Sequence, residues 1–286
     1  MRQSPYDGAV SGTDPLVRVV IRAKNEAAKI GTTLARLNAQ TLHGQIELVV
    51  VDSGSADATV QIARDAGAAL IEIPPESFTY GGALNTGCEG ATTPFVVALS
   101  AHAFPPDERW LERLLQPFSD ERVACACGYV MGPHAQPLAG RLVQDLELAQ
   151  LNPYWGYSNS SGAFRTELWR ERPFREDMVG TEDKEWAWYW LQRGKLVVVD
   201  PRFATEHSHQ DEGPRAVFRR SYNEWAGYAS YLELEPYGAR DLVRDWWTGL
   251  DGYPSHRRAR IGWRRAAKLL GKWRGHHSRA LRSAPS

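Results

Sequence analysis

The chain has 286 residues, of which 43% are hydrophobic and 24% are charged. This length suits one large α/β domain or one domain with an appendage, and the composition excludes a disordered, collagenous or coiled-coil chain. The 34 basic and 34 acidic residues balance overall, but residues 1–250 hold 24 basic and 33 acidic ones, whereas residues 251–286 hold 10 and 1. We therefore expect an acidic body with a basic tail.

Neither a membrane span nor a disulfide framework is expected. No apolar run approaches the ~20 residues that cross a bilayer, and the polar residues 1–15 predict a flexible leader without a signal core. The three cysteines, Cys88, Cys125 and Cys127, are too few for a framework and are interpreted as small buried residues. These features predict a cytoplasmic protein, with at most a peripheral contact at the inner membrane surface.

Short runs of β-branched residues alternate with helical patterns along the first part of the chain. Residues 27–40 have apolar residues at helical spacing, and Asp57 is placed to cap a second helix that ends at Gly67. Runs that are apolar throughout are typical of strands buried on both faces of a mostly parallel sheet, which binds ligands at the strands' carboxyl ends. The predicted strands are 17–21, 47–51, 69–73, 94–100 and 195–199.

The pattern becomes helical near residue 211, because residues 214–234 carry apolar residues at helical intervals. Within this part, the basic amphipathic segment 257–274 predicts docking on the acidic body, a peripheral membrane contact or an acidic protein partner. Nucleic acid is not expected, because no aromatic stacking platform accompanies the charge. The aromatic-rich helices are compatible with a homodimer. The expected organisation is a leader (1–15), an α/β domain (16–210) and a helical extension (211–286).

Polar residues follow the first two strands, where a ligand is expected. The first strand runs into Arg22, Asn25 and Glu26 without a G-x-G-x-x-G turn, which disfavours a Rossmann dehydrogenase. The second strand ends in Asp52, whose carboxylate can accept hydrogen bonds from a base edge or a ribose. The alternative is that Asp52 forms an Asx turn with the small residues after it.

Six segments resemble the family 2 glycosyltransferases with the GT-A fold, particularly their rhamnosyltransferase-like members. They occur in the family's order over about residues 17–210. The resemblance implies an α/β fold of GT-A type, with an open, mostly parallel nucleotide-binding sheet flanked by helices and, here, a C-terminal helical extension. The segments are VVIRAKNEAAKI, VVVDSGSADAT, YGGALNTGCEGATTPFVVALSAHAFP, NSSGAFR, GTEDKEWAWYWLQRG and VVVDPRFATEHSH.

The resemblance also implies roles for residues in these segments. Asp52 would bind the nucleobase, and Asp183, with Glu182 beside it, would be the general base that deprotonates the acceptor. From the residues alone, these two acids at a helix start would be a cap. The other residues expected on the donor side are Arg22, Asn25, Glu26, Ser55, Tyr80, Gly82, Asn85, Ala101, His102 and Ser161.

The chain departs from the family at the Asp-x-Asp motif that holds a divalent cation, where it has Ala101 and His102. Imidazole suits Mn²⁺ better than Mg²⁺, which prefers oxygen ligands. His102 would hold the cation together with His207 and His209, which share one face of a strand end. Otherwise metal binding is weakened, or histidinium contacts the diphosphate directly.

Together these features predict an inverting glycosyltransferase with an aspartate base. It would move a single sugar from a UDP- or dTDP-linked donor to a small-molecule, glycan or carrier-bound acceptor. Single addition is favoured because Gln192 and Arg193 are followed by Gly194, which breaks the Gln-x-x-Arg-Trp motif of processive members. Two alternatives stay open: a sugar-phosphate nucleotidyltransferase, which normally has a glycine-rich loop after its first strand, and a degenerate, non-catalytic module that binds nucleotide sugars.

Overall fold

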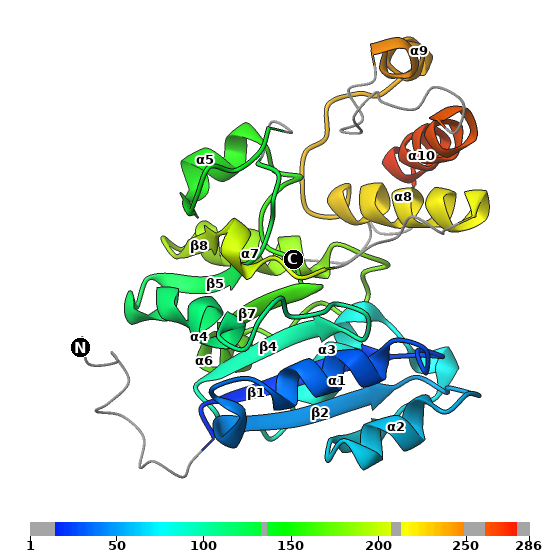
Figure 1. Cartoon of the computed structure of the whole chain (residues 1–286). Helices are drawn as coiled ribbons and strands as arrows, with labels where there is room; N and C mark the ends of the chain where they lie inside the picture. Colours follow the sequence, from blue (N-terminus) through cyan, green and yellow to red (C-terminus); the bar gives the residue numbers. More distant parts are fainter. Residues whose placement is uncertain (1–14, 133–135, 207–212, 249–260, 279–286) are drawn as a thin grey trace.

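The computed structural model describes residues 15–132, 136–206, 213–248 and 261–278. Within these ranges the strands are β1 (Val17–Ala23), β2 (Ile46–Asp52), β3 (Ala69–Glu72), β4 (Phe95–Ser100), β5 (Val123–Cys127), β6 (Leu142–Gln144), β7 (Ser161–Arg165) and β8 (Leu196–Val199). They form one sheet in the order β3-β2-β1-β4-β7-β5-β8-β6 (Figure 1). Only β7 and β6 run antiparallel to their neighbours among these strands. The predicted mostly parallel α/β sheet is confirmed.

Helices lie on both faces of the sheet and continue beyond it. They are α1 (Ile30–Asn38), α2 (Thr59–Asp65), α3 (Tyr80–Cys88), α4 (Trp110–Leu115), α5 (Leu146–Leu151), α6 (Thr166–Glu171), α7 (Glu182–Leu191), α8 (Pro214–Tyr228), α9 (Ala239–Thr248) and α10 (Ile261–His276). Short 3₁₀ turns occupy His43–Gln45, Pro75–Ser77, Gln116–Ser119 and Pro201–Phe203.

β1 shows why the sheet separates two hydrophobic cores. Val19 and Ile21 pack with side chains of α1 and α4 on one face, whereas Val20 packs with side chains of α3 on the other. Successive side chains of a strand point to opposite faces, so a strand covered on both sides carries apolar residues at every position. The fully buried Cys125 and Cys127 of β5 belong to the second core, as predicted for small apolar residues.

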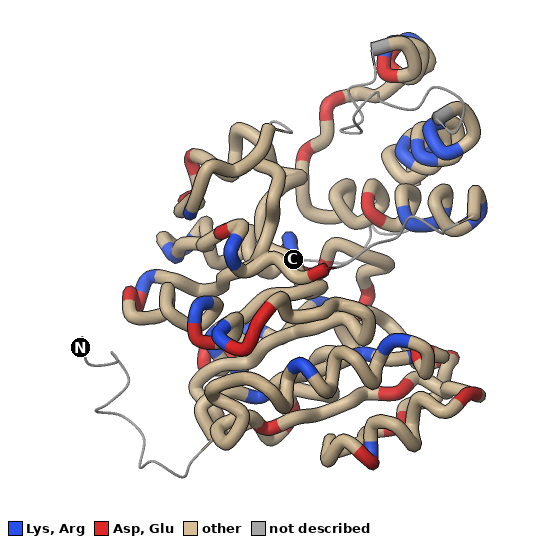
Figure 2. Tube along the Cα trace, viewed as in Figure 1, with Lys and Arg blue, Asp and Glu red and all other residues tan. Residues whose placement is uncertain are grey.

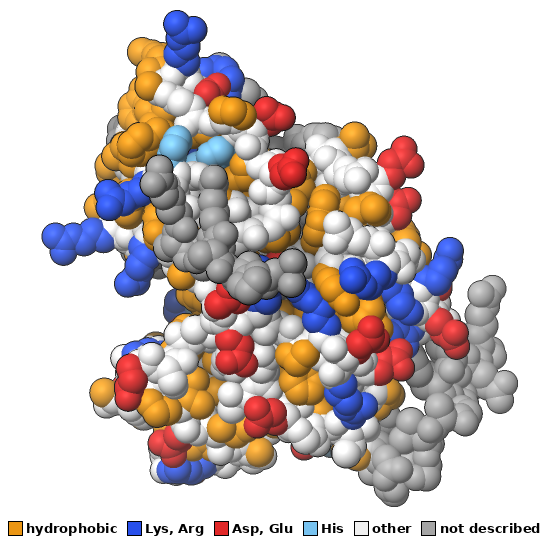
Figure 3. Space-filling view, turned by 180° about the vertical axis from the view of Figure 1, so that it is seen from behind, with side chains coloured by type: hydrophobic (Ala, Val, Ile, Leu, Met, Phe, Trp, Pro, Cys, Tyr) orange, Lys and Arg blue, Asp and Glu red, His pale blue; other side chains and the backbone are white. Residues whose placement is uncertain are grey.

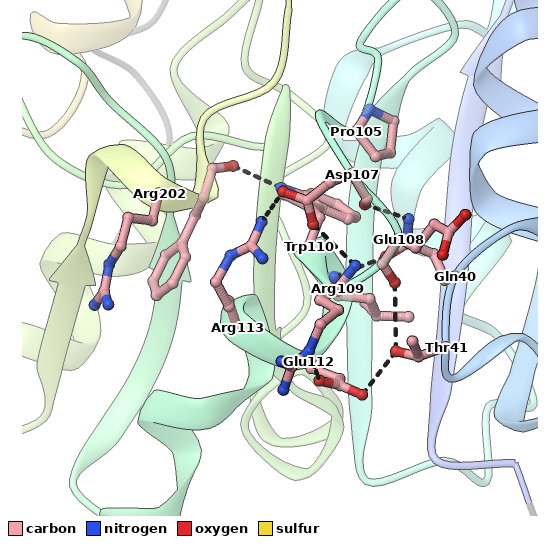
Figure 4. Close-up of polar contacts among 12 residues, drawn as sticks. Gln40, Thr41, Pro105, Asp107, Glu108, Arg109, Trp110, Glu112, Arg113 and Arg202 are labelled. Atoms are coloured by element: carbon pink, nitrogen blue, oxygen red, sulfur yellow. Dashed lines mark hydrogen bonds and ion pairs between the residues drawn. The ribbon is translucent and has the colours of Figure 1, made fainter.

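The loop 101–109 follows β4 and is anchored at its outer end (Figure 4). The backbone carbonyl of Asp107 accepts a hydrogen bond from Gln40 Nε2 at 2.9 Å. Next to this loop, the indole Nε1 of Trp110 donates to the carbonyl of Phe203 at 2.8 Å. These contacts hold a loop whose first residues lie at the carboxyl end of β4.

The helices α8, α9 and α10 stand away from the sheet (Figure 1). α10 packs along α8 at two glycines: a Cβ on Gly271 would lie 2.5 Å from the carbonyl oxygen of Phe218, and one on Gly275 would lie 2.5 Å from that of Tyr222. The absence of side chains at these positions is what allows the two backbones to come so close.

The basic segment predicted over 257–274 is helical from Ile261, and residues 257–260 lie outside the described part. α10 packs on α8 through its glycine face and on α9 through Lys272 and Asp245, and both helices lie within residues 1–250. Docking on the α/β domain itself stays a prediction. Of the apolar residues of α10, Leu269 is buried, with 2% exposed, whereas Leu270 and Trp273 are 51% and 42% exposed.

Candidate active site

The loops after β1 and β2 meet at the carboxyl edge of the sheet and are joined by hydrogen bonds. Asn25 has a left-handed backbone (φ 54°), which asparagine tolerates better than most residues. Its Oδ1 accepts from the N–H of Ala56 at 2.8 Å, and its own N–H donates to Ser55 Oγ at 2.8 Å. The N–H of Glu26 donates to Thr59 Oγ1 at 2.8 Å. Three residues predicted for the donor side, Asn25, Glu26 and Ser55, therefore belong to one hydrogen-bonded unit.

The two aspartates after β2 organise the backbone around them. Asp52 is 1% exposed and accepts from the N–H groups of Gly54 at 2.9 Å and Ser55 at 2.8 Å, which makes an Asx turn. Asp57, predicted to cap α2, lies one residue before the N-cap Ala58 and accepts from the N–H of Thr59 at 3.0 Å. A carboxylate can accept about four hydrogen bonds. The nucleobase role of Asp52 therefore stays a prediction beside its observed role in the turn.

His102 lies against Glu26, with 3.0 Å between Nδ1 and Oε1 and with 20% and 23% of the two side chains exposed. The imidazole follows β4 and the carboxylate follows β1, and these strands are neighbours in the sheet. The preceding residue, Ala101, is buried, and its carbonyl accepts from the hydroxyl of Thr33 at 2.7 Å. A nitrogen donor atom and an oxygen donor atom thus lie together where the family's metal motif is expected.

A complete metal site is not seen in the described ranges, where no group of three or more His, Cys, Asp or Glu residues could hold an ion. His207 and His209, which were predicted to complete the site, lie outside the described residues. A cation bound to a nucleotide commonly takes one or two ligands from the protein, and phosphate oxygens and waters supply the rest. Glu26 and His102 fit that arrangement, and their donor set suits Mn²⁺ better than Mg²⁺.

Arg22 joins the end of β1 to the start of α7. Its Nη1 lies 3.4 Å from Glu182 Oε1, and these side chains are only 14% and 6% exposed. The guanidinium also donates to the carbonyls of Tyr80 at 2.9 Å and Asn159 at 3.4 Å. Its central carbon lies 5.5 Å from the centre of the Tyr80 ring. The loop after β1 and the acidic pair of α7 therefore belong to one polar cluster.

Glu182 and Asp183 are adjacent but differ in environment. Burial raises the pKa of Glu182, the negative charge of Asp183 raises it further, and Arg22 opposes the shift. Asp183 has 13% of its side chain exposed. Its Oδ2 accepts from the N–H of Asn159 at 3.1 Å, and its Oδ1 accepts from that of Lys184 at 2.8 Å. Two backbone donors thus fix the Asp183 carboxylate, while Glu182 lies in the interior.

The turn before this pair is strained and is supported by α8. Thr181 has φ 62°, a left-handed conformation that β-branched residues rarely adopt. Gly227 of α8 packs so closely against this turn that an added Cβ would overlap Thr181 Oγ1 and the carbonyl oxygen of Gly180. The helical extension therefore helps to set the position from which α7 begins.

The side-chain amide of Asn85 makes its hydrogen bonds with other groups of the protein. Its Nδ2 donates to the carbonyl of Phe174 at 2.8 Å and to Glu176 Oε1 at 2.9 Å. Its Oδ1 accepts from Trp169 Nε1 at 2.9 Å and from the N–H of Phe174 at 3.1 Å. All four hydrogen bonds of the amide are thus made within the fold. Asn85 therefore joins α3 to Trp169 and Phe174, and its direct contact with a sugar-nucleotide donor stays a prediction.

Three further predicted residues lie around Arg22 and β7. Tyr80, at the start of α3, is 45% exposed. The N–H of Gly82 donates to Thr79 Oγ1 at 2.9 Å, which caps α3. The Ser161 hydroxyl, at the start of β7, is buried and has no hydrogen-bond partner among the residues that the structure describes. Their contacts with a donor stay predictions.

Asn159 and Lys184 belong to the site but were not singled out from the sequence. Lys184 Nζ lies 3.9 Å from Asp183 Oδ1. Burial lowers the pKa of Lys184, but the negative charge of Asp183, with smaller contributions from Tyr129 and Tyr228, raises it overall well above its ordinary value. Only their positions in the sequence could have pointed to these two residues, because Asn159 begins the segment NSSGAFR and Lys184 follows the acidic pair.

A family model described as "Glycosyl transferase family 2" matches residues 18–174, more than half of the chain. The chain belongs to glycosyl transferase family 2. The matched range includes Arg22, Asp52 and His102 and ends before the acidic pair of α7. It confirms the family that the six sequence segments resemble.

Two curated relatives are O-antigen chain rhamnosyltransferases. WbaN of Salmonella anatum is 29% identical over 193 residues, which cover 62% of this chain and 61% of WbaN. RfbN of Salmonella typhimurium is 27% identical over 225 residues, which cover 72% of this chain and 70% of RfbN. The chain thus spans about three fifths of WbaN and somewhat more of RfbN.

Solved structures show the same fold. The mannosyltransferase PcManGT from Pyrobaculum calidifontis, in complex with GDP-Man and Mn²⁺, superposes with a TM-score of 0.61 at 22% identity, covering 91% of this chain and 74% of PcManGT. S. aureus TarS gives a TM-score of 0.56 at 19% identity, covering 80% of this chain and 41% of TarS. At these identities the likeness establishes the fold alone, and that fold is the predicted GT-A type.

Proposed function

We propose that this protein transfers a single sugar from a nucleoside-diphosphate donor to an acceptor with inversion at the anomeric carbon. The observation that carries the proposal is the buried contact between Arg22 and Glu182. It links the carboxyl edge of the sheet, where GT-A folds bind their donor, to the acidic pair at the start of α7. A donor and an acceptor bound on the two sides of this contact would meet beside Asp183.

On the donor side, the joined loops after β1 and β2 would bind the nucleoside, with Asp52 in contact with the base. Glu26 and His102 would hold a divalent cation, Mn²⁺ in preference to Mg²⁺, against the diphosphate. Such a cation neutralises phosphate charge when it is bound. His207 and His209 stay candidate ligands.

On the acceptor side, Asp183 would act as the general base. In an inverting transfer the acceptor oxygen attacks from the face opposite the departing nucleotide, and a carboxylate takes its proton. The two backbone N–H groups that bind the Asp183 carboxylate fix its direction. Glu182 is less suited to this step, because its side chain is only 6% exposed and lies against Arg22.

The relatives narrow the choice of substrates to test. WbaN and RfbN are named for rhamnosyl transfer onto an O-antigen chain, which favours a nucleotide-linked rhamnose and a glycan or carrier-bound acceptor here. The UDP- or dTDP-linked donors expected from the sequence therefore come first. Membership in a transferase family disfavours the nucleotidyltransferase alternative.

The test compares Asp183→Asn with Asp177→Asn, which removes an exposed carboxylate that pairs with Arg175 just before α7. Asp183→Asn should lower kcat by about 10²–10⁴-fold, the usual contribution of a general base. Its nucleotide-induced rise in Tm should persist, and Asp177→Asn should keep full activity. The anomeric configuration of the product, read by NMR, should be inverted. Retained configuration, or full turnover by Asp183→Asn, would contradict the mechanism, and binding without any turnover would indicate the non-catalytic module.

A further inference from the structure

The outer side of α10 carries an exposed aromatic and apolar stripe. Trp263, Leu270 and Trp273 are 42%, 51% and 42% exposed, and His277 continues the same line. Residues spaced by seven, three and four positions lie on one side of a helix with about 3.6 residues per turn. We call these four residues the α10 stripe.

The α10 stripe points away from both neighbouring helices. Gly271 and Gly275 face α8. Towards α9, Lys272 Nζ pairs with Asp245 Oδ2 at 2.9 Å, and Arg265 Nη1 donates to the carbonyl of Trp246 at 3.0 Å. On a helix that turns by about 100° per residue, the stripe lies opposite these positions. Figure 3 shows hydrophobic side chains gathered along the outer edge of the helical extension, with Lys and Arg beside them.

The helical extension that carries the α10 stripe is net positive, but most of the basic residues of α10 lie on its α8 and α9 sides, and Arg274 is the one beside the stripe. α10 carries five Lys or Arg residues and no Asp or Glu, and Figure 2 shows basic residues on both α8 and α10. Over the described parts of the extension, 213–248 and 261–278, ten basic residues stand against five acidic ones. α9 adds the exposed Val243 and Trp247, which are 54% and 78% accessible.

Exposed tryptophans on a net positive extension match the surface of an anionic lipid bilayer best. Tryptophan is enriched at the level of lipid headgroups, and Lys and Arg are attracted to anionic lipids, each contributing about fivefold to binding. An acidic protein would satisfy the charge but would not require exposed tryptophans. A second copy of the chain would bring like charge against like charge. Among the described helices, none is long and apolar enough to cross a membrane, so the contact is with the surface.

We propose that the α10 stripe docks on an anionic lipid bilayer, with its two tryptophans at the headgroup level and the net positive charge of the helical extension attracted to the lipid charge. The α10 stripe lies on the helical extension, and within this extension Gly227 of α8 packs against the turn before Glu182. The proposal concerns binding alone and does not depend on the sugar-transfer mechanism.

The test is co-sedimentation with vesicles of phosphatidylcholine alone and of phosphatidylcholine mixed with phosphatidylglycerol. The unmodified protein should bind the anionic vesicles, should bind the neutral ones far less, and should be released by high salt. Trp263→Ser with Trp273→Ser should weaken binding by about tenfold or more, because two interfacial anchors are lost. Leu151→Ser is the matched control, since it removes a 69% exposed apolar side chain from α5, outside the extension.

A second measurement uses the unmodified protein, in case the double variant folds poorly. Anionic vesicles that contain brominated lipid should quench part of the tryptophan fluorescence, because bromine quenches only rings that reach the membrane. The proposal is overturned by the absence of binding to anionic vesicles, by equal binding to neutral ones, or by binding that the double variant retains. Light scattering that shows a dimer in the unmodified protein and a monomer in the double variant would also overturn it, in favour of a second copy on the stripe.

Discussion

Replacing Arg22 by Met should destabilise the protein more at high pH than at low pH. Burial and the charge of Asp183 raise the pKa of Glu182 from its ordinary value of 4.5, and Arg22 is the cation that opposes this shift. Without Arg22 the folded protein will hold Glu182 as the neutral acid over a wider pH range. A carboxyl with a raised folded pKa stabilises the fold at low pH, and this contribution is lost as pH rises through the folded value. The deficit of Arg22→Met should therefore grow with pH.

The magnitude follows from the burial of the pair. Breaking a buried ion pair by removing one partner costs about 3–5 kcal/mol, and the 3.4 Å separation favours the lower end. About 3 kcal/mol at pH 8 corresponds to a fall in Tm of roughly 6–12 °C for a domain of this size. At pH 5 the loss should be smaller, because the raised pKa of Glu182 favours its neutral form more at low pH than at high pH. About 1 kcal/mol should remain for the lost hydrogen bonds to the carbonyls of Tyr80 and Asn159.

Thermal unfolding between these pH values measures the effect, and Arg18→Met is the matched control. Arg18 lies in the same strand and pairs with Glu47 at 2.7 Å, but Glu47 is 35% exposed, so water can solvate its charge when the arginine is gone. The loss in Arg18→Met should change little with pH. Adding Glu182→Gln to Arg22→Met should recover most of the loss at pH 8. The reasoning is refuted if Arg22→Met loses the same stability at both pH values or if the second substitution recovers nothing.

Three further predictions concern the surroundings of the site. Gly227→Ala should lower the free energy of unfolding by about 1–3 kcal/mol in thermal unfolding, because the new methyl group overlaps the turn at Thr181. Gly262→Ala is the control and should be neutral or slightly stabilising, because a Cβ there has nothing within 4 Å. Equal effects of the two substitutions would contradict the close contact. Asn85→Ala should lower the free energy of unfolding in urea by at least about 2 kcal/mol, because it leaves Trp169 Nε1 and the N–H of Phe174 buried without an acceptor. A loss below about 0.5 kcal/mol would show that these hydrogen bonds do not stabilise the fold. His102→Ala should weaken Mn²⁺-dependent nucleotide binding by at least about tenfold in calorimetry while leaving Mn²⁺-free binding unchanged, and an unaltered Mn²⁺ response would exclude His102 as a ligand.

The strands that the sequence identified are those with a strong local signal. β1, β2, β4 and β8 are runs of β-branched residues because both of their faces are buried. β5 reads Val-Ala-Cys-Ala-Cys, and its small residues also occur in helices, so composition does not distinguish it. β6 has only three residues. The antiparallel β7 lies in the segment NSSGAFR, which only the family resemblance singled out, because its small residues carry no period.

The site was predictable residue by residue but not as an arrangement. Glu26 and His102 were both named from the sequence, and only the adjacency of β1 and β4 brings them within 3.0 Å. The Arg22–Glu182 contact joins residues 160 positions apart, which no local pattern reveals. The buried face of α10 was predicted only in part, at Leu269, for a related reason. Close packing on α8 selects the glycines, although hydrophobicity alone favours burying Leu270 and Trp273.

The most direct test of the account is thermal unfolding with UDP, dTDP, GDP, ADP and CDP, each with Mn²⁺, with Mg²⁺ and with EDTA. A ligand at about 100 times its Kd stabilises a protein by about 2.7 kcal/mol, which corresponds to several degrees in Tm. The account predicts a rise with one of these nucleotides, with UDP and dTDP the first candidates, that is larger with Mn²⁺ than with Mg²⁺ or EDTA. No rise with any nucleotide under any of these conditions would contradict the assignment of the sheet edge as a nucleotide-sugar site.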